Sequence, residues 1–231
     1  MEFRYGEQTG SLPGDTYSED IAEGTPSGGD FSAKRIFDIV AATLGLIFIA
    51  PLLLVVALLI RLQDGQKVLY CPTRLGYQGQ TFRCFKLRTM VPDADSKLQA
   101  VLESCAEARL EWDLTQKLTN DPRITPMGKF IRATSIDELP QLLNIIRGDM
   151  SLVGPRPISF NERSRYGEYF DAYTRVRPGL TGLWQTSGRS NTTYAERIRL
   201  DTRYAQTRTF WGDVWILVKT VPVVLLSVGA K

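Results

Sequence analysis

An uncharged apolar run from Ile39 to Ile60 constrains this chain more than any other feature of its sequence. The run is long enough for a helix that crosses the hydrocarbon core of a bilayer. Pro51 lies near its middle, where the ring clashes with the Ile47 carbonyl and the missing N–H interrupts the helical hydrogen bonds. The run therefore predicts a membrane helix that is broken at Ala50 and Pro51.

Basic residues flank this run on both sides, with Lys34 and Arg35 before it and Arg61 and Lys67 after it. Basic flanks favour the cytoplasmic side of a membrane. Such flanks at both ends, with a break between them, fit a re-entrant helix that enters the bilayer and returns to the same face. A kinked helix that spans the bilayer once remains open, because proline is tolerated in spanning helices.

The charge of the chain is divided unevenly. Residues 1–30 hold one Arg against seven acidic residues and are rich in Gly and Ser, which predicts a disordered acidic tail. Because the whole chain has a net charge of +3, the remaining residues carry +9. A basic body suits an anionic partner, such as phosphates, an anionic membrane surface or nucleic acid.

The chain has no histidine and only three cysteines, which form no CxxC pair. The absence of histidine excludes Ser-His and Cys-His triads, histidine-ligated metal sites and imidazole acid–base chemistry. Catalysis would have to use Asp, Glu, Lys, Arg or a metal ion. The odd number of cysteines favours reduced thiols in a cytosolic domain over a disulfide framework or a zinc site.

The rest of the chain has a mixed pattern that predicts a mainly helical α+β domain. Short strands are expected at residues 68–70 and 81–89. Helices are expected at 93–117, 127–133 and 138–147.

The C-terminal stretch 210–226 is apolar and contains Trp211 and Trp215. It suits either an amphipathic segment at the membrane interface or a helix that docks on the soluble core. The same stretch leaves a homodimer open.

The segment from Thr134 to Gly148 carries the pattern most informative for chemistry. Its apolar residues follow helical spacing, and Pro140 fits the first turn, which places Asp137 at or near the N-cap and Glu138 at the first helical position. Free N–H groups and the helix dipole hold a carboxylate ionised there. Adjacent carboxylates diverge around the axis, so one can act as a nucleophile and the other as a magnesium ligand. A purely capping role is the alternative.

Several basic residues accompany this pair in strands and rigid loops. Lys86 and Arg88 share one face of the predicted strand. Arg156 stands between two prolines, Pro155 and Pro157, which fix its backbone. Arginine matches phosphate oxygens with two parallel hydrogen bonds. These residues, with the carboxylate pair and the apolar run, predict a polyphosphate substrate beside a bilayer.

The chain resembles the bacterial sugar transferases, the monotopic polyprenol-phosphate phosphoglycosyl transferases, from Lys34 almost to its C-terminus. The short form of the family, without a bundle of spanning helices upstream, is similar to this chain and includes enzymes that start exopolysaccharide repeat units. The resemblance is carried by Lys34-Arg35-Ile36-Phe37-Asp38, Arg74-Leu75-Gly76, Phe85-Lys86-Leu87-Arg88-Thr89-Met90, Asn120-Asp121-Pro122-Arg123, Asp137-Glu138-Leu139-Pro140-Gln141, Val153-Gly154-Pro155-Arg156-Pro157, Arg177-Pro178-Gly179-Leu180-Thr181-Gly182, Gly188-Arg189 and Asp201-Thr202-Arg203-Tyr204.

This resemblance implies roles for particular residues. Asp137 is expected to be the nucleophile and Glu138 to bind Mg²⁺, and a re-entrant helix is expected to break at Ala50 and Pro51, where the family often has Ser-Pro. Four basic residues match family positions that hold the nucleotide-sugar phosphates or uridine. Together with two neighbours they make up the expected substrate-binding set: Lys86, Arg88, Arg132, Pro155, Arg156 and Arg189.

The implied reaction transfers galactose or glucose 1-phosphate from a UDP-sugar to undecaprenyl phosphate and releases UMP, through a covalent sugar-phosphoryl aspartate. It would be the first membrane step of exopolysaccharide synthesis, at the cytoplasmic side of the bacterial inner membrane, with no nucleic-acid partner. The expected division is an acidic tail at 1–30, a re-entrant membrane helix at 31–64 and a cytoplasmic catalytic domain at 65–231. The alternative is a non-catalytic protein of the inner membrane that binds anionic lipid or serves in assembly.

Overall fold

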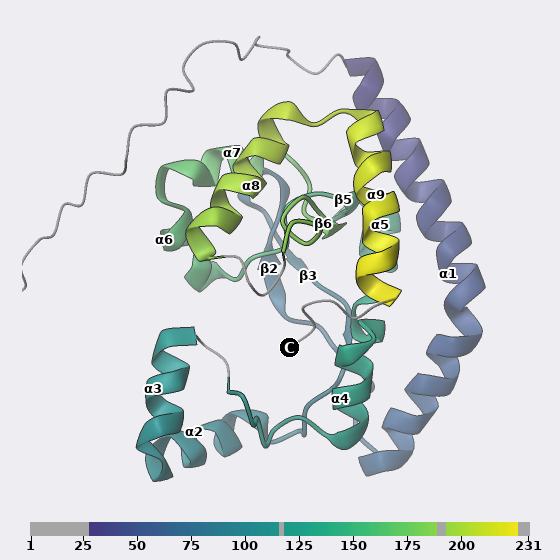
Figure 1. The fold of residues 1–231 in the computed structure, drawn as a ribbon. Coiled ribbons are helices and arrows are strands. Elements are labelled where there is room, and N and C mark those ends of the chain that lie inside the picture. Colours follow the sequence, from purple (N-terminus) through teal and green to yellow (C-terminus); the bar gives the residue numbers. More distant parts are fainter. Residues whose placement is uncertain (1–27, 116–117, 189–192, 226–231) are drawn as a thin grey trace, which may run out of the picture.

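The computed structural model describes residues 28–115, 118–188 and 193–225, which form a mainly helical α+β fold (Figure 1). The elements in chain order are α1 (Gly28–Asp64), β1 (Leu69–Tyr70), β2 (Thr73–Leu75), η1 (Tyr77–Gly79), β3 (Thr81–Arg83), β4 (Lys86–Leu87), α2 (Ala94–Ser104), α3 (Ala106–Thr115), α4 (Pro126–Ala133), η2 (Ile136–Glu138), α5 (Gln141–Arg147), β5 (Ser151–Val153), η3 (Phe160–Glu162), α6 (Arg163–Tyr166), η4 (Gly167–Tyr169), α7 (Phe170–Thr174), β6 (Gly179–Thr181), α8 (Tyr194–Thr207) and α9 (Phe210–Leu225).

The strands of the described residues form small two-stranded sheets. β1 pairs with β4 and β2 with β3, both antiparallel, whereas β5 and β6 are parallel. The strand predicted at 81–89 is therefore divided into β3 and β4, because its two halves pair with different partners. Its second half places Lys86 opposite Tyr70 and leaves Leu87 buried.

Helix α1 continues through Pro51, so the predicted break at Ala50 and Pro51 is absent from the helix. Figure 1 shows α1 as a single ribbon that curves along one side of the body, and a bend at an internal proline is the expected distortion. Leu46 before the proline and Leu53 after it both pack on the body. This packing offsets the hydrogen bond that Pro51 cannot donate. The helix also includes residues 28–30, which were expected in the tail; residues 1–27 lie outside the described part.

Both halves of α1 contact the soluble body. Ala42 in the first half is fully buried in a cluster with Ile145 of α5. Val56 and Ile60 in the second half pack with Ile131 of α4. The opposite face of the helix is apolar and exposed, and includes Ile36, Val40, Leu44, Ile47, Phe48, Leu54, Leu58 and Leu62. Exposed apolar surface of this extent needs a non-aqueous cover.

The start of α1 is joined to the body by a buried polar junction. The Lys34 ammonium lies 2.6 Å from an Asp213 carboxylate oxygen of α9. Asp38 accepts a hydrogen bond from the Ser151 hydroxyl at 2.7 Å, and the Tyr204 hydroxyl donates to Asp213 at 2.8 Å. Asp38 and Asp213 are almost fully buried, so Lys34 balances charges that water does not reach.

Arg35 contacts the helix that follows the predicted carboxylate pair. Its guanidinium donates to the Ile145 carbonyl at 2.7 Å and to the Met150 carbonyl at 3.3 Å, at the C-terminal end of α5. Arg177 donates from the loop before β6 to the Gly148 carbonyl at 2.9 Å. Cations at this end satisfy carbonyl groups without helical partners and complement the helix dipole. The membrane-type helix α1 therefore supports the helix behind the candidate site.

We predict that Lys34→Met lowers the free energy of unfolding by about 3 kcal/mol, because it leaves the buried carboxylates of Asp38 and Asp213 without their cation. Thermal unfolding in detergent micelles measures the effect. The matched control is Lys67→Met, at an exposed position, which should leave the unfolding temperature unchanged. Equal unfolding temperatures for the two variants would contradict the structural role of Lys34.

The helix predicted at 93–117 is divided into α2 and α3 at Cys105, which has an extended backbone, and residues 116–117 lie outside the described part. The Cys105 sulfur accepts a hydrogen bond from the Ala108 N–H and so caps the start of α3. The helix predicted at 127–133 is confirmed as α4, which begins one residue earlier. Thr125 caps α4 by accepting from the Gly128 N–H.

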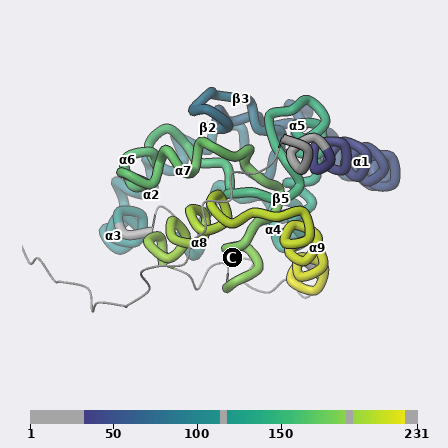
Figure 2. Tube along the Cα trace, turned by 90° about the horizontal axis from the view of Figure 1, so that it is seen from above, coloured from purple at the N-terminus to yellow at the C-terminus, as the bar shows by residue number. Residues whose placement is uncertain are grey.

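Helix α9 docks on the body and also exposes aromatic residues. Asp213 and Ile216 on one face are buried, whereas Trp211 and Trp215 on the other are exposed. Figures 1 and 2 place α9 on the same side of the body as α1. The docking role considered for the stretch 210–226 is therefore confirmed for residues 210–225, and residue 226 lies outside the described part. The interfacial role stays a prediction, which the exposed tryptophans suit.

Candidate active site

The carboxylate pair lies in a short turn between two helices. The helix predicted at 138–147 is two elements, η2 and α5, and Pro140 precedes α5 instead of lying in its first turn. Ser135 has the left-handed backbone conformation (φ 57°), which turns the chain sharply after α4. Asp137 is consequently inside a 3-10 turn and is not the N-cap of a longer helix.

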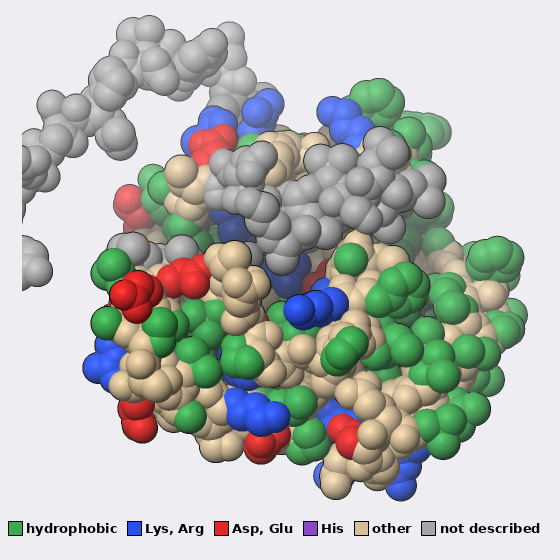
Figure 3. Space-filling view, turned by 60° about the horizontal axis from the view of Figure 1, so that its bottom comes forward, with side chains coloured by type: hydrophobic (Ala, Val, Ile, Leu, Met, Phe, Trp, Pro, Cys, Tyr) green, Lys and Arg blue, Asp and Glu red, His purple; other side chains and the backbone are tan. Residues whose placement is uncertain are grey.

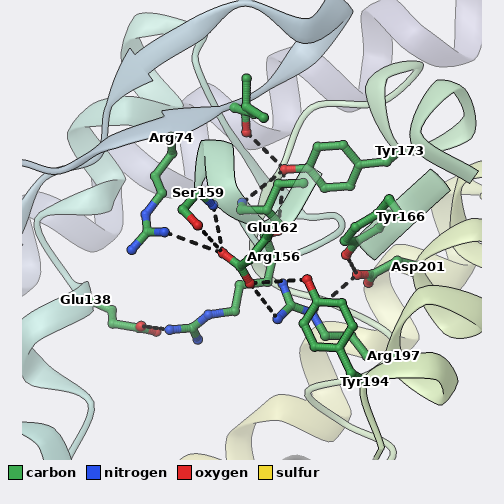
Figure 4. Close-up of polar contacts among 12 residues, drawn as sticks. Arg74, Glu138, Arg156, Ser159, Glu162, Tyr166, Tyr173, Tyr194, Arg197 and Asp201 are labelled. Atoms are coloured by element: carbon green, nitrogen blue, oxygen red, sulfur yellow. Dashed lines mark hydrogen bonds and ion pairs between the residues drawn. The ribbon is translucent and has the colours of Figure 1, made fainter. Parts of the chain in front are cut away.

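Glu138 brings together two of the predicted phosphate-binding residues. Its Oε1 accepts from the Lys86 ammonium at 2.8 Å and lies 3.2 Å from a terminal nitrogen of Arg156. Figure 4 shows Arg156 extending to Glu138 from the loop after β5. Lys86 comes from β4, so side chains separated by 52 residues in the sequence meet at this carboxylate. Asp137, beside it, has no hydrogen bond from another described residue.

The environment of Asp137 is partly desolvated and electrically mixed. Burial raises the pKa of Asp137 above its ordinary value, and the adjacent Glu138 carboxylate raises it further. Lys86, Arg132 and Arg156 act in the opposite direction because their positive charges favour the ionised form. A carboxylate with little surrounding water and nearby cations is suited to nucleophilic attack on an anionic phosphoryl group.

The other predicted substrate-binding residues are distributed differently. Arg132 is near enough to Asp137 to affect its pKa, and its Nε donates to the Thr89 hydroxyl at 2.8 Å. Arg88 does not approach the carboxylate pair, because it binds Asp64 at the end of α1 at 2.5 Å. Pro155 is fully buried beside Arg156 and acts as a support. Arg189 lies outside the described residues.

The sequence patterns assign no role to a partly buried polar network behind Arg156. Glu162 is its centre, since its carboxylate accepts from the Ser159 N–H at 2.7 Å and pairs with Arg74 at 3.6 Å and Arg197 at 3.5 Å (Figure 4). Arg197 also lies 3.7 Å from Asp201. Arg74 and Asp201 belong to motifs that carry the family resemblance. Their presence in these motifs is the sequence signal that could have pointed to this network.

Burial raises the pKa of Asp201 to about 6. The Tyr166 hydroxyl, which donates to this carboxylate at 2.8 Å, and the Arg197 charge both favour its ionised form. The ion pairs of Glu162 thus continue into helix α8. This part of the chain is a rigid frame for the loop that carries Arg156.

Tyr173 joins that frame to the loop of Arg156. Its hydroxyl donates to the Leu75 carbonyl at 2.9 Å and accepts from the Ile158 N–H at 3.3 Å. The loop also lies very close to the start of β6, because a Cβ on Gly179 would be 2.1 Å from the Gly154 nitrogen. Only glycine permits this approach. These contacts fix the backbone from which Arg156 reaches Glu138.

The face of the molecule that lies at the bottom of Figure 1 contains a hollow, which Figure 3 shows from the front. Figure 3 shows basic and acidic side chains deep in a hollow near its centre, and hydrophobic side chains most numerous on the right, the side of α1 in Figure 1. A charged hollow beside an apolar edge suits a polar substrate and a lipid substrate that approach from different directions.

The donor set at the carboxylate pair fits only one kind of metal site. The described residues contain no group of three or more His, Cys, Asp or Glu side chains able to hold a metal ion. Mg²⁺ usually binds through one or two carboxylates together with substrate phosphates and water. Glu138 fits that arrangement, in which the phosphates of a bound substrate would complete the set of ligands.

Most of the chain matches a known family. The profile described as "Bacterial sugar transferase" covers residues 29–227, and the chain belongs to this family. It is therefore a transferase, and the non-catalytic alternative is disfavoured. Family membership and the exposed apolar face of α1, a helix long and apolar enough to cross a membrane, together indicate association with a membrane.

Curated relatives carry specific names. The chain is 48% identical to the exopolysaccharide production protein ExoY of Sinorhizobium fredii, over 86% of this chain and 88% of that protein. It is 46% identical to the undecaprenyl-phosphate galactose phosphotransferase of Salmonella typhimurium, over 85% of this chain but 41% of that longer protein. It is 42% identical to the UDP-glucose:undecaprenyl-phosphate glucose-1-phosphate transferase of Caulobacter vibrioides, over 85% of this chain and 71% of that protein.

Proposed function

We propose that this protein transfers galactose or glucose 1-phosphate from a UDP-sugar to undecaprenyl phosphate and releases UMP, as the first membrane step of exopolysaccharide synthesis. The observation that carries the proposal is the carboxylate pair of Asp137 and Glu138, held among Lys86, Arg132 and Arg156 next to an apolar helix. The names of the relatives supply the substrates.

The first half of the reaction occurs at Asp137. A carboxylate oxygen of Asp137 attacks the phosphorus bonded to the sugar, the bond from this phosphorus to the bridging oxygen breaks, and UMP leaves with that oxygen. The product is a sugar-phosphoryl aspartate. Lys86 and Arg156 bind Glu138 in the free enzyme and are placed to bind the phosphate oxygens of the donor in its stead. Their positive charges would then offset the repulsion between the anionic nucleophile and the anionic diphosphate.

The second half regenerates the enzyme. An oxygen of undecaprenyl phosphate attacks the same phosphorus, the bond to Asp137 breaks, and the lipid leaves as a diphosphate-linked sugar. Because the attacking oxygen is already an anion, no general base is needed, which agrees with a chain that has no histidine. Mg²⁺ held by Glu138 and the donor phosphates would supply charge neutralisation at the transferring phosphoryl group.

The packing of α1 supports a position on one side of the membrane. The helix has 37 residues, or about 55 Å, and both halves contact the soluble body. A helix that crossed a hydrocarbon core of about 30 Å would carry one of these contacts into or across the bilayer. We therefore propose that both ends of α1 lie at the cytoplasmic face and that its outer surface rests in the lipid. This is a monotopic arrangement with a curved helix in place of the expected break.

Cysteine labelling tests this topology. In a chain with Cys71, Cys84 and Cys105 replaced by alanine, we expect neither Ala33→Cys nor Gln66→Cys to react with a membrane-impermeant maleimide in intact spheroplasts. Both positions are exposed at opposite ends of α1, so both should react once the membrane is permeabilised. Labelling of only one position in intact spheroplasts indicates a spanning helix and contradicts the proposal.

Release of UMP provides the direct test of the reaction. Purified protein is mixed with undecaprenyl phosphate and, separately, with UDP-galactose, UDP-glucose and UDP-N-acetylglucosamine. We expect UMP with one of the first two donors and formation of the matching lipid-linked sugar. UMP formation with none of these donors would contradict the proposed function. The homodimer expected from the C-terminal stretch stays a prediction, and the mass of the detergent-solubilised protein in the same preparation measures it.

A further inference from the structure

Thr89 joins the segment after β4 to helix α4 through its backbone and its side chain. It follows β4 and is 7% exposed. Its carbonyl accepts from the Thr125 N–H at 3.1 Å, at the start of α4. Its hydroxyl accepts from the Arg132 Nε at 2.8 Å, in the last turn of the same helix. One buried residue therefore holds both ends of the short helix α4.

The contact between Thr89 and α4 leaves no room for adjustment. A Cβ on Gly128 would lie 2.0 Å from the Thr89 carbonyl oxygen, so the helix rests directly on this peptide group. The Thr125 hydroxyl caps the helix through the Gly128 N–H at 2.9 Å. Because α4 cannot shift relative to Thr89, the Thr89 hydroxyl has a fixed position at the Nε of Arg132.

Arg132 experiences competing charges at this point. The carboxylates of Asp137 and Asp121 attract its guanidinium, and the guanidinium of Arg123 repels it. Arg123 is itself bound to Asp121 by hydrogen bonds of 2.6 and 2.8 Å, so the Asp121 carboxylate already has a cationic partner. The hydrogen bond from Nε to Thr89 fixes the plane of the Arg132 group. It leaves the donors on the terminal nitrogens for a substrate oxygen.

We propose that Thr89 is a positioning residue, which fixes Arg132 beside Asp137 so that the Arg132 fork meets the diphosphate of the donor. This inference rests on the proposed function. Threonine suits the task because its β-branched side chain has few rotamers, and because a buried hydroxyl that accepts from a cation forms a stronger hydrogen bond than a neutral pair does. Thr89 touches no reacting atom in this account and acts only through Arg132.

The test uses two substitutions at Thr89 that differ in one chemical group. Thr89→Val keeps the shape and removes the acceptor, and Thr89→Ser keeps the hydroxyl. We expect kcat/KM for the UDP-sugar to fall about tenfold in Thr89→Val and to stay within about twofold of the parent in Thr89→Ser. If Arg132 meets the donor before the chemical step, most of the loss lies in KM for the donor, and the KM for undecaprenyl phosphate is unchanged.

A double-mutant cycle separates positioning from a general structural effect. In an Arg132→Met background, Thr89→Val should cost no further activity, because the group that it positions is already gone. Arg132→Lys, which has no Nε donor, should lose about as much as Thr89→Val does, and this arm applies even where the valine variant is unstable. Equal costs of Thr89→Val in the parent and in Arg132→Met, or full activity of Arg132→Lys, would overturn the proposal.

A spectroscopic measurement keeps this inference separate from the proposed function. The Nε–H resonance of Arg132, identified by its loss in Arg132→Lys, should be protected from solvent exchange in the parent and in Thr89→Ser, and unprotected in Thr89→Val. Equal protection in all three chains overturns the inference whatever the enzyme transfers. Protection lost only in Thr89→Val, in an enzyme inactive with every donor, would reject the proposed function while leaving the Thr89–Arg132 contact established.

Discussion

Asp137→Asn is expected to lower turnover by at least about a thousandfold, the largest effect of any single substitution in this chain. The amide is nearly the same size as the carboxylate but cannot attack phosphorus. Burial and the adjacent Glu138 already make the ionised form of Asp137 costly, so removal of its charge should not unfold the protein. The initial rate of UMP release from the UDP-sugar that the parent enzyme uses is the measurement.

The covalent step has its own signature in the absence of the lipid acceptor. We expect the parent chain to release one equivalent of UMP in a burst and to gain the mass of one hexose phosphate, whereas Asp137→Asn shows neither change. Asp171→Asn, at an exposed acidic position of α7, is the matched control and should behave as the parent does. Asp137→Asn with full activity, or a parent chain that never gains mass during turnover, excludes the aspartyl intermediate.

Removal of divalent cations is expected to have the second largest effect. EDTA should abolish turnover, and added Mg²⁺ should restore it, because the cations on Glu138 only partly balance the charge of a bound diphosphate. Glu138→Gln should raise the Mg²⁺ concentration needed for half-maximal rate by at least about tenfold. The dependence of the initial rate on free Mg²⁺ gives both results.

Glu168→Gln provides the comparison, since Glu168 is exposed and distant in sequence from the carboxylate pair. Its Mg²⁺ dependence should equal that of the parent. A parent enzyme that keeps its full rate in EDTA would show that Lys86, Arg132 and Arg156 suffice to balance the phosphates. An unchanged Mg²⁺ requirement in Glu138→Gln would assign the metal to other ligands.

Much of the candidate site follows from local pattern. Alternation placed Lys86 on a strand, the two prolines indicated a rigid loop at Arg156, and both residues do meet Glu138. The α4 helix and the mainly helical α+β class also follow from spacing and capping residues. These features depend on the near neighbours of each residue, so the sequence contains enough information to predict them.

Features that depend on distant partners could not be predicted. Lys34 and Arg35 were interpreted as basic membrane flanks, but they bind Asp213 and the carbonyls at the end of α5, more than a hundred residues away. Arg88 was expected on the same face of the strand as Lys86, but it pairs with Asp64 and not with the carboxylate pair. No local rule indicates these partners, because any exposed cation has the same sequence signature.

The helical continuity of α1 has a similar cause. Proline removes one hydrogen bond, which is a local effect that the sequence does indicate, but packing of residues on both sides of Pro51 decides whether the helix ends there. The break of the 93–117 helix is the reverse case. The Cys105 sulfur offers a cap that makes two shorter helices favourable.

The hydrogen bonds from Arg35 to the end of α5 couple the apolar helix α1 to the helix beside the carboxylate pair. Helix α1, whose outer face is apolar and exposed, binds the C-terminal end of α5 through Arg35, and the 3-10 turn that contains Asp137 lies just before the N-terminal end of α5. We expect a molecule released from the membrane into water to expose the apolar face of α1 to solvent and to hold the end of α5 less firmly through Arg35. Under the proposed function, we expect such a molecule to release little UMP, so that the donor is consumed mainly by enzyme that lies next to its lipid acceptor.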